Sequence, residues 1–149
     1  MTYDDLLREA EIEQLTVREK PLRSAKGRIF GNRIAIKKDL SETEKACVLA
    51  EEIGHYYTTV GNILDQSNTG NRKQEIQARK WAVDKMISIE DLFRAAEQPC
   101  RNLYEIAEYL DVTEDFLLEA IEVFKKRYGH SYTNGERSIT FCDSGFCIK

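Results

Sequence analysis

Two carboxylates and one imidazole lie close together in the segment Glu51-Glu52-Ile53-Gly54-His55. Residues four apart on a helix project from the same face, so Glu51 and His55 are placed to bind one metal ion together. Glu52 lies between them, where a carboxylate can accept a proton from a metal-activated water molecule. These residue types at this spacing predict metal-assisted hydrolysis.

The same segment also fits the solvent-facing side of an amphipathic helix. At about 100° per residue, Glu51, Glu52 and His55 fall within one arc of the helix, and Glu44 and Lys45 share much of it. A charged arc of this kind is common on a surface helix. The five letters alone therefore leave both interpretations open.

The sequence before this segment predicts one helix and a small antiparallel sheet. Residues 2–12 have helical spacing of their apolar side chains. Residues 15–19 read as a short strand, and residues 28–30 and 33–36 flank Gly31-Asn32, a two-residue hairpin signal. We expect these three strands to precede the helix that carries Glu51.

Helices dominate the rest of the chain. Ser41-Glu42-Thr43-Glu44 is a capping box that opens a helix to about residue 58. A polar loop over residues 61–70 is expected next, with Asn71 capping a second helix over 72–87. Ser88 is placed to cap a third helix over 89–98, which Pro99 closes, and residues 138–141 and 146–148 predict a C-terminal hairpin.

Glu75 is the candidate third ligand on the second of these helices. On a helical wheel it falls among apolar residues, where an ionised carboxylate is costly unless it is paired or bound to metal. Ala78, Ala82 and Gly54 are small enough to let the two helices approach closely. An ion pair with Arg79, one turn along the helix, is the alternative partner.

The chain resembles the ImmA/IrrE family of zinc-dependent metallopeptidases, in the short form carried by phages and mobile elements. The resemblance rests on residues 49–57, with E-E-x-x-H in place of H-E-x-x-H, and on the E-x-x-A segment that begins at Glu75. It implies a zincin-like helical core, metal ligands at Glu51, His55 and Glu75, and a general base at Glu52. Zinc is the implied metal.

Glu51 is the departure from that family pattern. A carboxylate is an acceptable zinc ligand, but two carboxylates and one imidazole bring one more negative charge than a His-His-Glu set. The metal then becomes a weaker Lewis acid, and an oxygen-rich set also suits manganese or iron. The sequence leaves the activity of this variant open.

Residues 102–126 resemble a helix-turn-helix. The second of its helices would enter a DNA groove with its first residues, which include Glu114, Asp115 and Glu119. Phosphates repel these carboxylates, so we expect a packing or docking lobe instead. We divide the chain into a metallopeptidase-like domain over residues 1–98 and a helical lobe with its C-terminal tail over 99–149, within an α+β fold.

Composition narrows the setting of this fold. The 149 residues carry a net charge of −4, which gives no reason to expect direct binding of nucleic acid. The start of the sequence does not read as an export signal, no apolar run is long enough to span a membrane, and the four scattered cysteines are typical of reduced thiols. A cytoplasmic protein with no membrane partner is expected.

The family resemblance supplies the expected function. It implies a metal-dependent endopeptidase that cleaves or inactivates a helix-turn-helix repressor of a phage or mobile element, with Glu52 activating a metal-bound water. The alternative is a non-catalytic antirepressor, or repressor-binding protein, that keeps a structural or vestigial metal site. Glu51, where the family pattern has histidine, keeps this alternative open.

Overall fold

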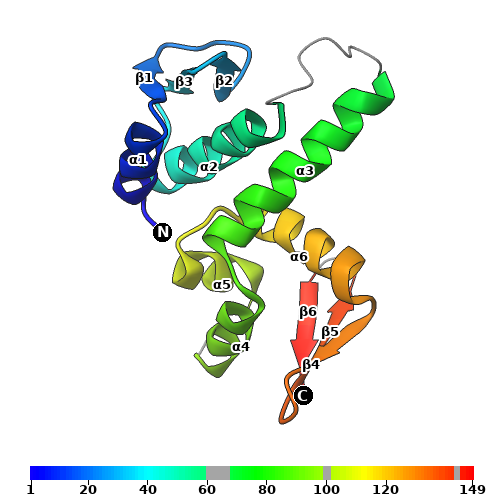
Figure 1. Cartoon of the computed structure of the whole chain (residues 1–149). Coiled ribbons are helices and arrows are strands. Elements are labelled where there is room, and N and C mark those ends of the chain that lie inside the picture. Colours follow the sequence, from blue (N-terminus) through cyan, green and yellow to red (C-terminus); the bar gives the residue numbers. More distant parts are fainter. Residues whose placement is uncertain (60–67, 99–101, 143–144) are drawn as a thin grey trace. The chain divides into compact units, whose positions relative to one another are not determined.

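The computed structural model describes residues 1–59, 68–98, 102–142 and 145–149, and the chain folds as two compact units, Met1–Met86 and Ile87–Lys149 (Figure 1). The α+β class predicted from the sequence is confirmed. The first unit contains, in order, α1 (Tyr3–Ile12), β1 (Thr16–Lys20), β2 (Gly27–Phe30), β3 (Arg33–Lys37), α2 (Glu42–Thr59) and α3 (Asn68–Met86).

The sheet of the first unit is mixed, which corrects the expectation of an antiparallel one. Its strand order is β1-β3-β2, with β2 antiparallel and β1 parallel to β3. The turn at Gly31, where φ is +61°, returns the chain beside β2 as expected. The connector over residues 21–26 instead carries the chain past β3, so β1 lies on the far side of β3 and runs in its direction.

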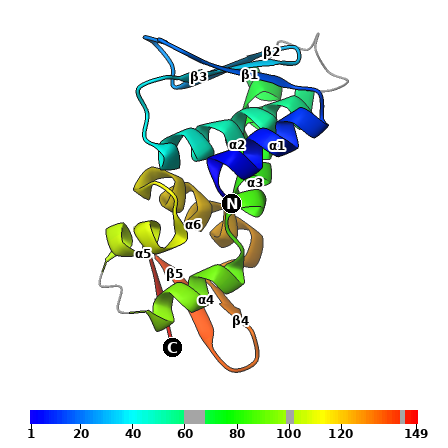
Figure 2. The same cartoon turned by 90° about the vertical axis from the view of Figure 1, so that its left-hand side faces the viewer.

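One face of this sheet packs on helices. Figure 2 shows the sheet above α1 and α2, which lie side by side. Side chains alternate between the two faces of a strand, so Ile34 and Ile36 of β3 point inward and are buried against α2. Leu49 and Ile53 of α2 are fully buried in the same core. The strands thereby fix the position of the helix that carries Glu51 and Glu52.

Two helix starts bear on the predicted boundaries. The Ser41 Oγ accepts a hydrogen bond from the Glu44 backbone N–H at 3.1 Å, as expected for the start of α2. Helix α3 begins at Asn68, so Asn71 lies inside the helix and does not cap it. Residues 61–67 of the predicted polar loop, and Pro99, lie outside the described residues.

The second unit comprises α4 (Ile89–Glu97), α5 (Leu103–Leu110), α6 (Glu114–Tyr128), β4 (Ser131–Thr133), β5 (Ser138–Cys142) and β6 (Gly145–Ile148). Ser88 caps α4 through the Asp91 backbone N–H. The predicted C-terminal hairpin is confirmed as β5 and β6, and β4 adds a third antiparallel strand. Helix α4 belongs to this unit, whereas the sequence interpretation placed it in the first domain.

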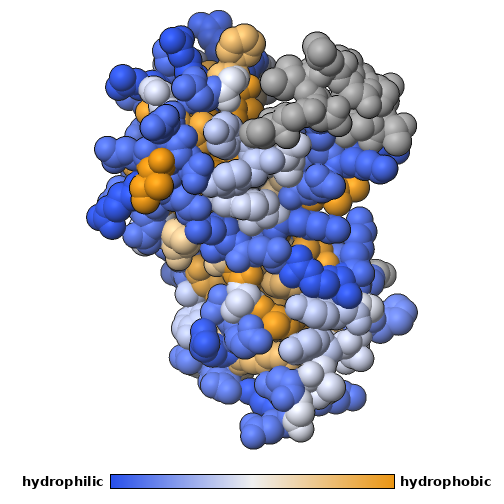
Figure 3. Space-filling model, viewed as in Figure 1, coloured by the Kyte–Doolittle hydropathy of each residue, from blue (hydrophilic) through white to orange (hydrophobic). Residues whose placement is uncertain are grey.

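The α5–α6 pair has the connection expected for a helix-turn-helix-like lobe. Asp111 ends α5 in the left-handed region, at φ +57°, and Thr113 caps α6. Glu114 and Asp115 are exposed at the start of α6. The molecular face in Figure 3 is predominantly hydrophilic, with apolar side chains showing in smaller groups. In the described part of the chain, no helix combines the length and apolar character needed to cross a bilayer.

Candidate active site

Helices α2 and α3 touch at their small residues. A Cβ atom added at Gly54 would lie 2.5 Å from the backbone carbonyl oxygen of Ala78, closer than real Cβ atoms come to a neighbour. Ala78 and Ala82 are buried on the facing side of α3. The close approach expected from these three residues is confirmed. It sets the two backbones near each other directly beside His55.

His55 and Glu75 meet across this contact. The Nε2 atom of His55 lies 3.5 Å from Oε2 of Glu75. Two donors bound at ordinary zinc distances to one tetrahedral ion are about 3.3 Å apart, so this pair is close to the separation that a shared metal ion requires. Together with Glu51, Ala78 and Arg79, they line a small polar cavity between the helices.

Glu75 is not buried in an apolar face, contrary to expectation. Its side chain is 64% exposed, and the neighbouring Ile76 is also exposed. Helix α2 covers only the stripe of α3 around Ala78 and Ala82, so Glu75 lies at the margin of the contact and keeps much of its hydration. Burial of its charge therefore gives no reason to expect a metal ion at Glu75. Its proximity to His55 is what supports a ligand role.

Glu51 lines the same cavity from one turn before His55. Over residues 1–59, 68–98, 102–142 and 145–149, however, no three His, Cys, Asp or Glu side chains are arranged to hold a metal ion. Two of the predicted ligands are thus near a coordinating separation, and the set of Glu51, His55 and Glu75 stays a prediction. Its donors, two carboxylates and one imidazole, fit zinc as well as manganese or iron.

Glu52 faces the sheet. A Cβ atom at Gly27, the first residue of β2, would lie 3.2 Å from both Cγ and Oε1 of Glu52. Burial, with the negative charge of Glu75 as the smaller cause, raises the pKa of Glu52 to about 7. A carboxylate with a pKa near neutrality can accept a proton and return it. This property suits the predicted general base.

Gly27 is the site residue that the sequence interpretation missed. It begins β2 and leaves room for the Glu52 carboxyl and the Val48 side chain. A glycine in a strand often marks a close approach by another group. The glycine could be seen in the sequence, but the sequence did not indicate that Glu52 is the group that approaches it.

Comparison with protein families agrees with this geometry. Residues 10–122 match the model of the IrrE N-terminal-like domain, a metallopeptidase family. The match spans β1 to β3, α2 and α3, including every predicted site residue. No curated protein and no solved structure gives a significant match. Since more than two thirds of its length fits the family model, the chain belongs to the IrrE N-terminal-like family of metallopeptidases, which implies a metal cofactor.

Proposed function

We propose that this protein is a cytoplasmic metal-dependent endopeptidase that cleaves or inactivates a helix-turn-helix repressor of a phage or mobile element. The observation that carries the proposal is the His55–Glu75 pair, 3.5 Å apart across two helices, with Glu52 on the same helix as His55. The proposal requires no direct contact with nucleic acid or membrane. Its substrate class comes from the family resemblance.

Each site residue has a role in this mechanism. Glu51, His55 and Glu75 would hold the metal, whose positive charge would polarise the scissile carbonyl and acidify a water molecule. The Glu52 carboxylate would take a proton from that water and pass it to the departing amine nitrogen. In the metal-free protein, burial raises the pKa of Glu52 to about 7, which makes its carboxylate a stronger proton acceptor than an exposed glutamate.

A non-catalytic antirepressor is the second candidate function. Glu51 favours it, because a second carboxylate weakens the Lewis acidity of any metal held there. In this case the chain would bind the repressor and keep the metal, if any, for structure. Binding and derepression would then be independent of the Glu52 carboxylate.

Metal content is the first test. Tag-free wild-type protein should contain about one equivalent of zinc, manganese or iron by plasma mass spectrometry. His55→Ala and Glu75→Gln should each lose most of it. Glu122→Gln, which removes a charge from an exposed position on α6, serves as the matched control and should retain the metal. Equal metal content in all four proteins would exclude the proposed ligand set.

Glu52→Gln then separates the two functions. It keeps the size of the side chain and the proposed ligands but removes the group that accepts the proton. If the protein is a peptidase, the variant should bind a helix-turn-helix repressor, cleave it at least about a hundredfold more slowly, and fail to derepress. Unchanged derepression by Glu52→Gln would favour the antirepressor.

A further inference from the structure

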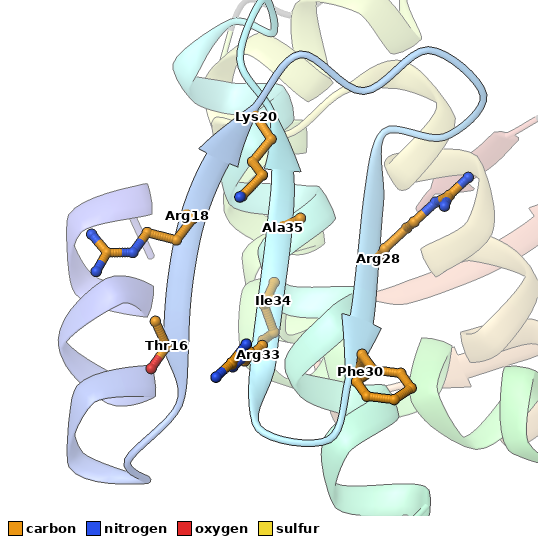
Figure 4. Close-up of a pocket in the computed structure, with 8 residues that line it drawn as sticks. All are labelled: Thr16, Arg18, Lys20, Arg28, Phe30, Arg33, Ile34 and Ala35. Atoms are coloured by element: carbon orange, nitrogen blue, oxygen red, sulfur yellow. The ribbon is translucent and has the colours of Figure 1, made fainter.

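The sheet face that points away from α2 forms a basic groove. Since strand residues alternate between the two faces, β1, β2 and β3 each place polar side chains on the outward side (Figure 4). The groove has a volume of about 430 Å³. Its lining residues are Thr16, Arg18, Lys20, Arg28, Phe30, Arg33, Ile34 and Ala35.

The cations of this groove are largely unneutralised. Arg18, Lys20 and Arg33 are exposed, and the described residues include no ion-pair or hydrogen-bond partner for their side chains. Arg28 donates a hydrogen bond to the Ser24 Oγ at 2.7 Å, which leaves its charge in place. The lining includes no carboxylate, so the face presents a concentrated positive potential.

An acid on the same strand points the other way. Glu19 lies between Arg18 and Lys20 in β1, and its Oε1 atom forms an ion pair with Lys45 Nζ of α2 at 2.7 Å. Because side chains alternate along β1, Glu19 is directed toward the helices, whereas Arg18 and Lys20 are directed to the outer face. This separation leaves the positive charge of the outer face intact.

Phe30 adds an apolar element to the groove. Its side chain is 87% exposed at the end of β2, and it lies opposite Arg33 in the β2–β3 register. An exposed aromatic side chain next to cations is suited to a partner that combines anionic and apolar groups. The groove therefore has two recognition elements, four positive charges and one aromatic ring.

The spacing of the groove cations indicates the shape of the partner. In an extended peptide segment, alternate side chains are about 6.8 Å apart, the same repeat as Arg18 and Lys20 on β1. A short acidic segment in this conformation can therefore place successive carboxylates against successive cations.

We propose that this groove docks a short, extended, acidic segment with an apolar side chain, on the protein whose inactivation is proposed above; the inference thus rests on the proposed function. Strand β2 connects the groove to the active site, since Gly27 faces Glu52 on one side and Arg28 faces the groove on the other. A substrate held on the outer face is therefore separated from Glu52 by a single layer of sheet. Docking raises the local concentration of the scissile segment.

Binding is measured apart from catalysis, in the Glu52→Gln background. The probe is a short fluorescein-labelled peptide in which aspartates alternate with serines around one leucine, followed by fluorescence anisotropy. Arg18→Glu combined with Arg33→Glu should weaken its binding by about tenfold or more, because two exposed ion pairs become like-charge contacts. The matched control is Lys73→Glu with Lys80→Glu, exposed cations of α3, which should change affinity less than about twofold.

Two further probes define the partner. A peptide with asparagines in place of the aspartates should bind at least about tenfold more weakly, and Phe30→Ser should weaken binding of the acidic peptide about threefold. Absence of acidic-peptide binding would overturn the proposal. So would tighter binding of a labelled oligothymidylate that is lost in the Arg18→Glu, Arg33→Glu variant, since the groove would then be a nucleic-acid site.

Cleavage kinetics separate this inference from the proposed function. In the wild-type background, the Arg18→Glu, Arg33→Glu variant should raise KM for the intact repressor about tenfold with kcat unchanged. A change in kcat with unchanged KM would overturn the docking role. If no repressor is cleaved by any variant while peptide binding follows the groove substitutions, the peptidase function fails and the acidic-segment groove stands.

Discussion

Substitution of Gly54 by alanine tests the helix contact on which the active site depends. The new Cβ atom would lie 2.5 Å from the Ala78 carbonyl oxygen and 3.2 Å from its carbonyl carbon and Cα. Carbon and oxygen atoms in ordinary contact are at least about 3.3 Å apart. Helices α2 and α3 must therefore separate by about 0.8 Å, or Ala78 must move by that amount.

Two opposing terms set the effect on stability. Alanine in a helix interior is favoured over glycine by about 1 kcal/mol, whereas overpacking of this kind costs about 1–3 kcal/mol. The contact is with backbone atoms, which cannot rotate away as a side chain can, so we expect the upper part of this cost. The net loss is then about 1–2 kcal/mol in the free energy of unfolding, or a Tm lower by about 3–6 °C for a chain of 149 residues.

The same displacement should impair metal binding. The His55 Nε2 and Glu75 Oε2 atoms, now 3.5 Å apart, would move about 0.8 Å further from each other and past the separation that one zinc ion bridges. We expect a zinc affinity at least about tenfold lower, measured by titration against a chromophoric chelator. Circular dichroism melts of metal-free protein give the stability term separately.

A second variant makes this test specific. Ala78→Gly should not rescue Gly54→Ala, because the clash is with the Ala78 backbone and not with its side chain. If Gly54→Ala were as stable as the wild type or more so, with unchanged zinc affinity, helix propensity would have outweighed the contact. The close approach of α2 and α3 would then be refuted as the basis of the site.

Three further changes act on the same site. In chelator-treated protein, the pKa of Glu52 is raised from 4.5 to about 7, so between these pH values the folded state binds more protons than the unfolded state. The free energy of unfolding should therefore fall by up to about 3 kcal/mol as pH rises from 4.5 to about 7. Urea titrations measure this fall, and Glu52→Gln should remove it. Glu51→His, which restores the H-E-x-x-H pattern, should bind zinc about tenfold more tightly because imidazole suits zinc better than a carboxylate does, and it should cleave faster because one negative charge leaves the ligand set. Gly27→Ala, whose Cβ would lie 2.5 Å from Val48 Cγ1 and 3.2 Å from Glu52 Oε1, should lower kcat about tenfold while metal content by mass spectrometry is unchanged.

The sequence predicts those parts of the site that depend on periodicity along one helix. Ala78 and Ala82 are four residues apart on α3, and Gly54 lies on α2, so small residues on both helices predicted their close contact. Family membership was predicted on the same two segments and is confirmed by the match over residues 10–122. Caps at Ser41 and Ser88 likewise follow from local chemistry, because a capping hydroxyl bonds a backbone N–H only three residues away.

Features that depend on residues far apart in the sequence could not be predicted from periodicity or local capping. The apolar alternation of β1 is the same whether it pairs parallel or antiparallel, so its direction is decided by the path of residues 21–26. A helical wheel treats every turn as equally covered, but α2 covers only part of α3 and leaves Glu75 exposed. The role of Gly27 depends on Glu52, which is 25 positions later in the sequence.

The small cavity beside His55 gathers Glu51, Glu75 and Arg79 around one imidazole. Two carboxylates so placed are stabilised by a nearby cation, and the cavity lining already contributes a guanidinium. A divalent metal ion in this cavity would face the positive charge of Arg79, which would lower the affinity of the site for the metal. If Arg79 is the cation that neutralises the two carboxylates, the cavity provides polar contacts that hold α2 and α3 together, which suits a binding protein. With a metal ion in that role, the same carboxylates become ligands beside the Glu52 proton acceptor, and the two functions proposed here differ in which cation prevails.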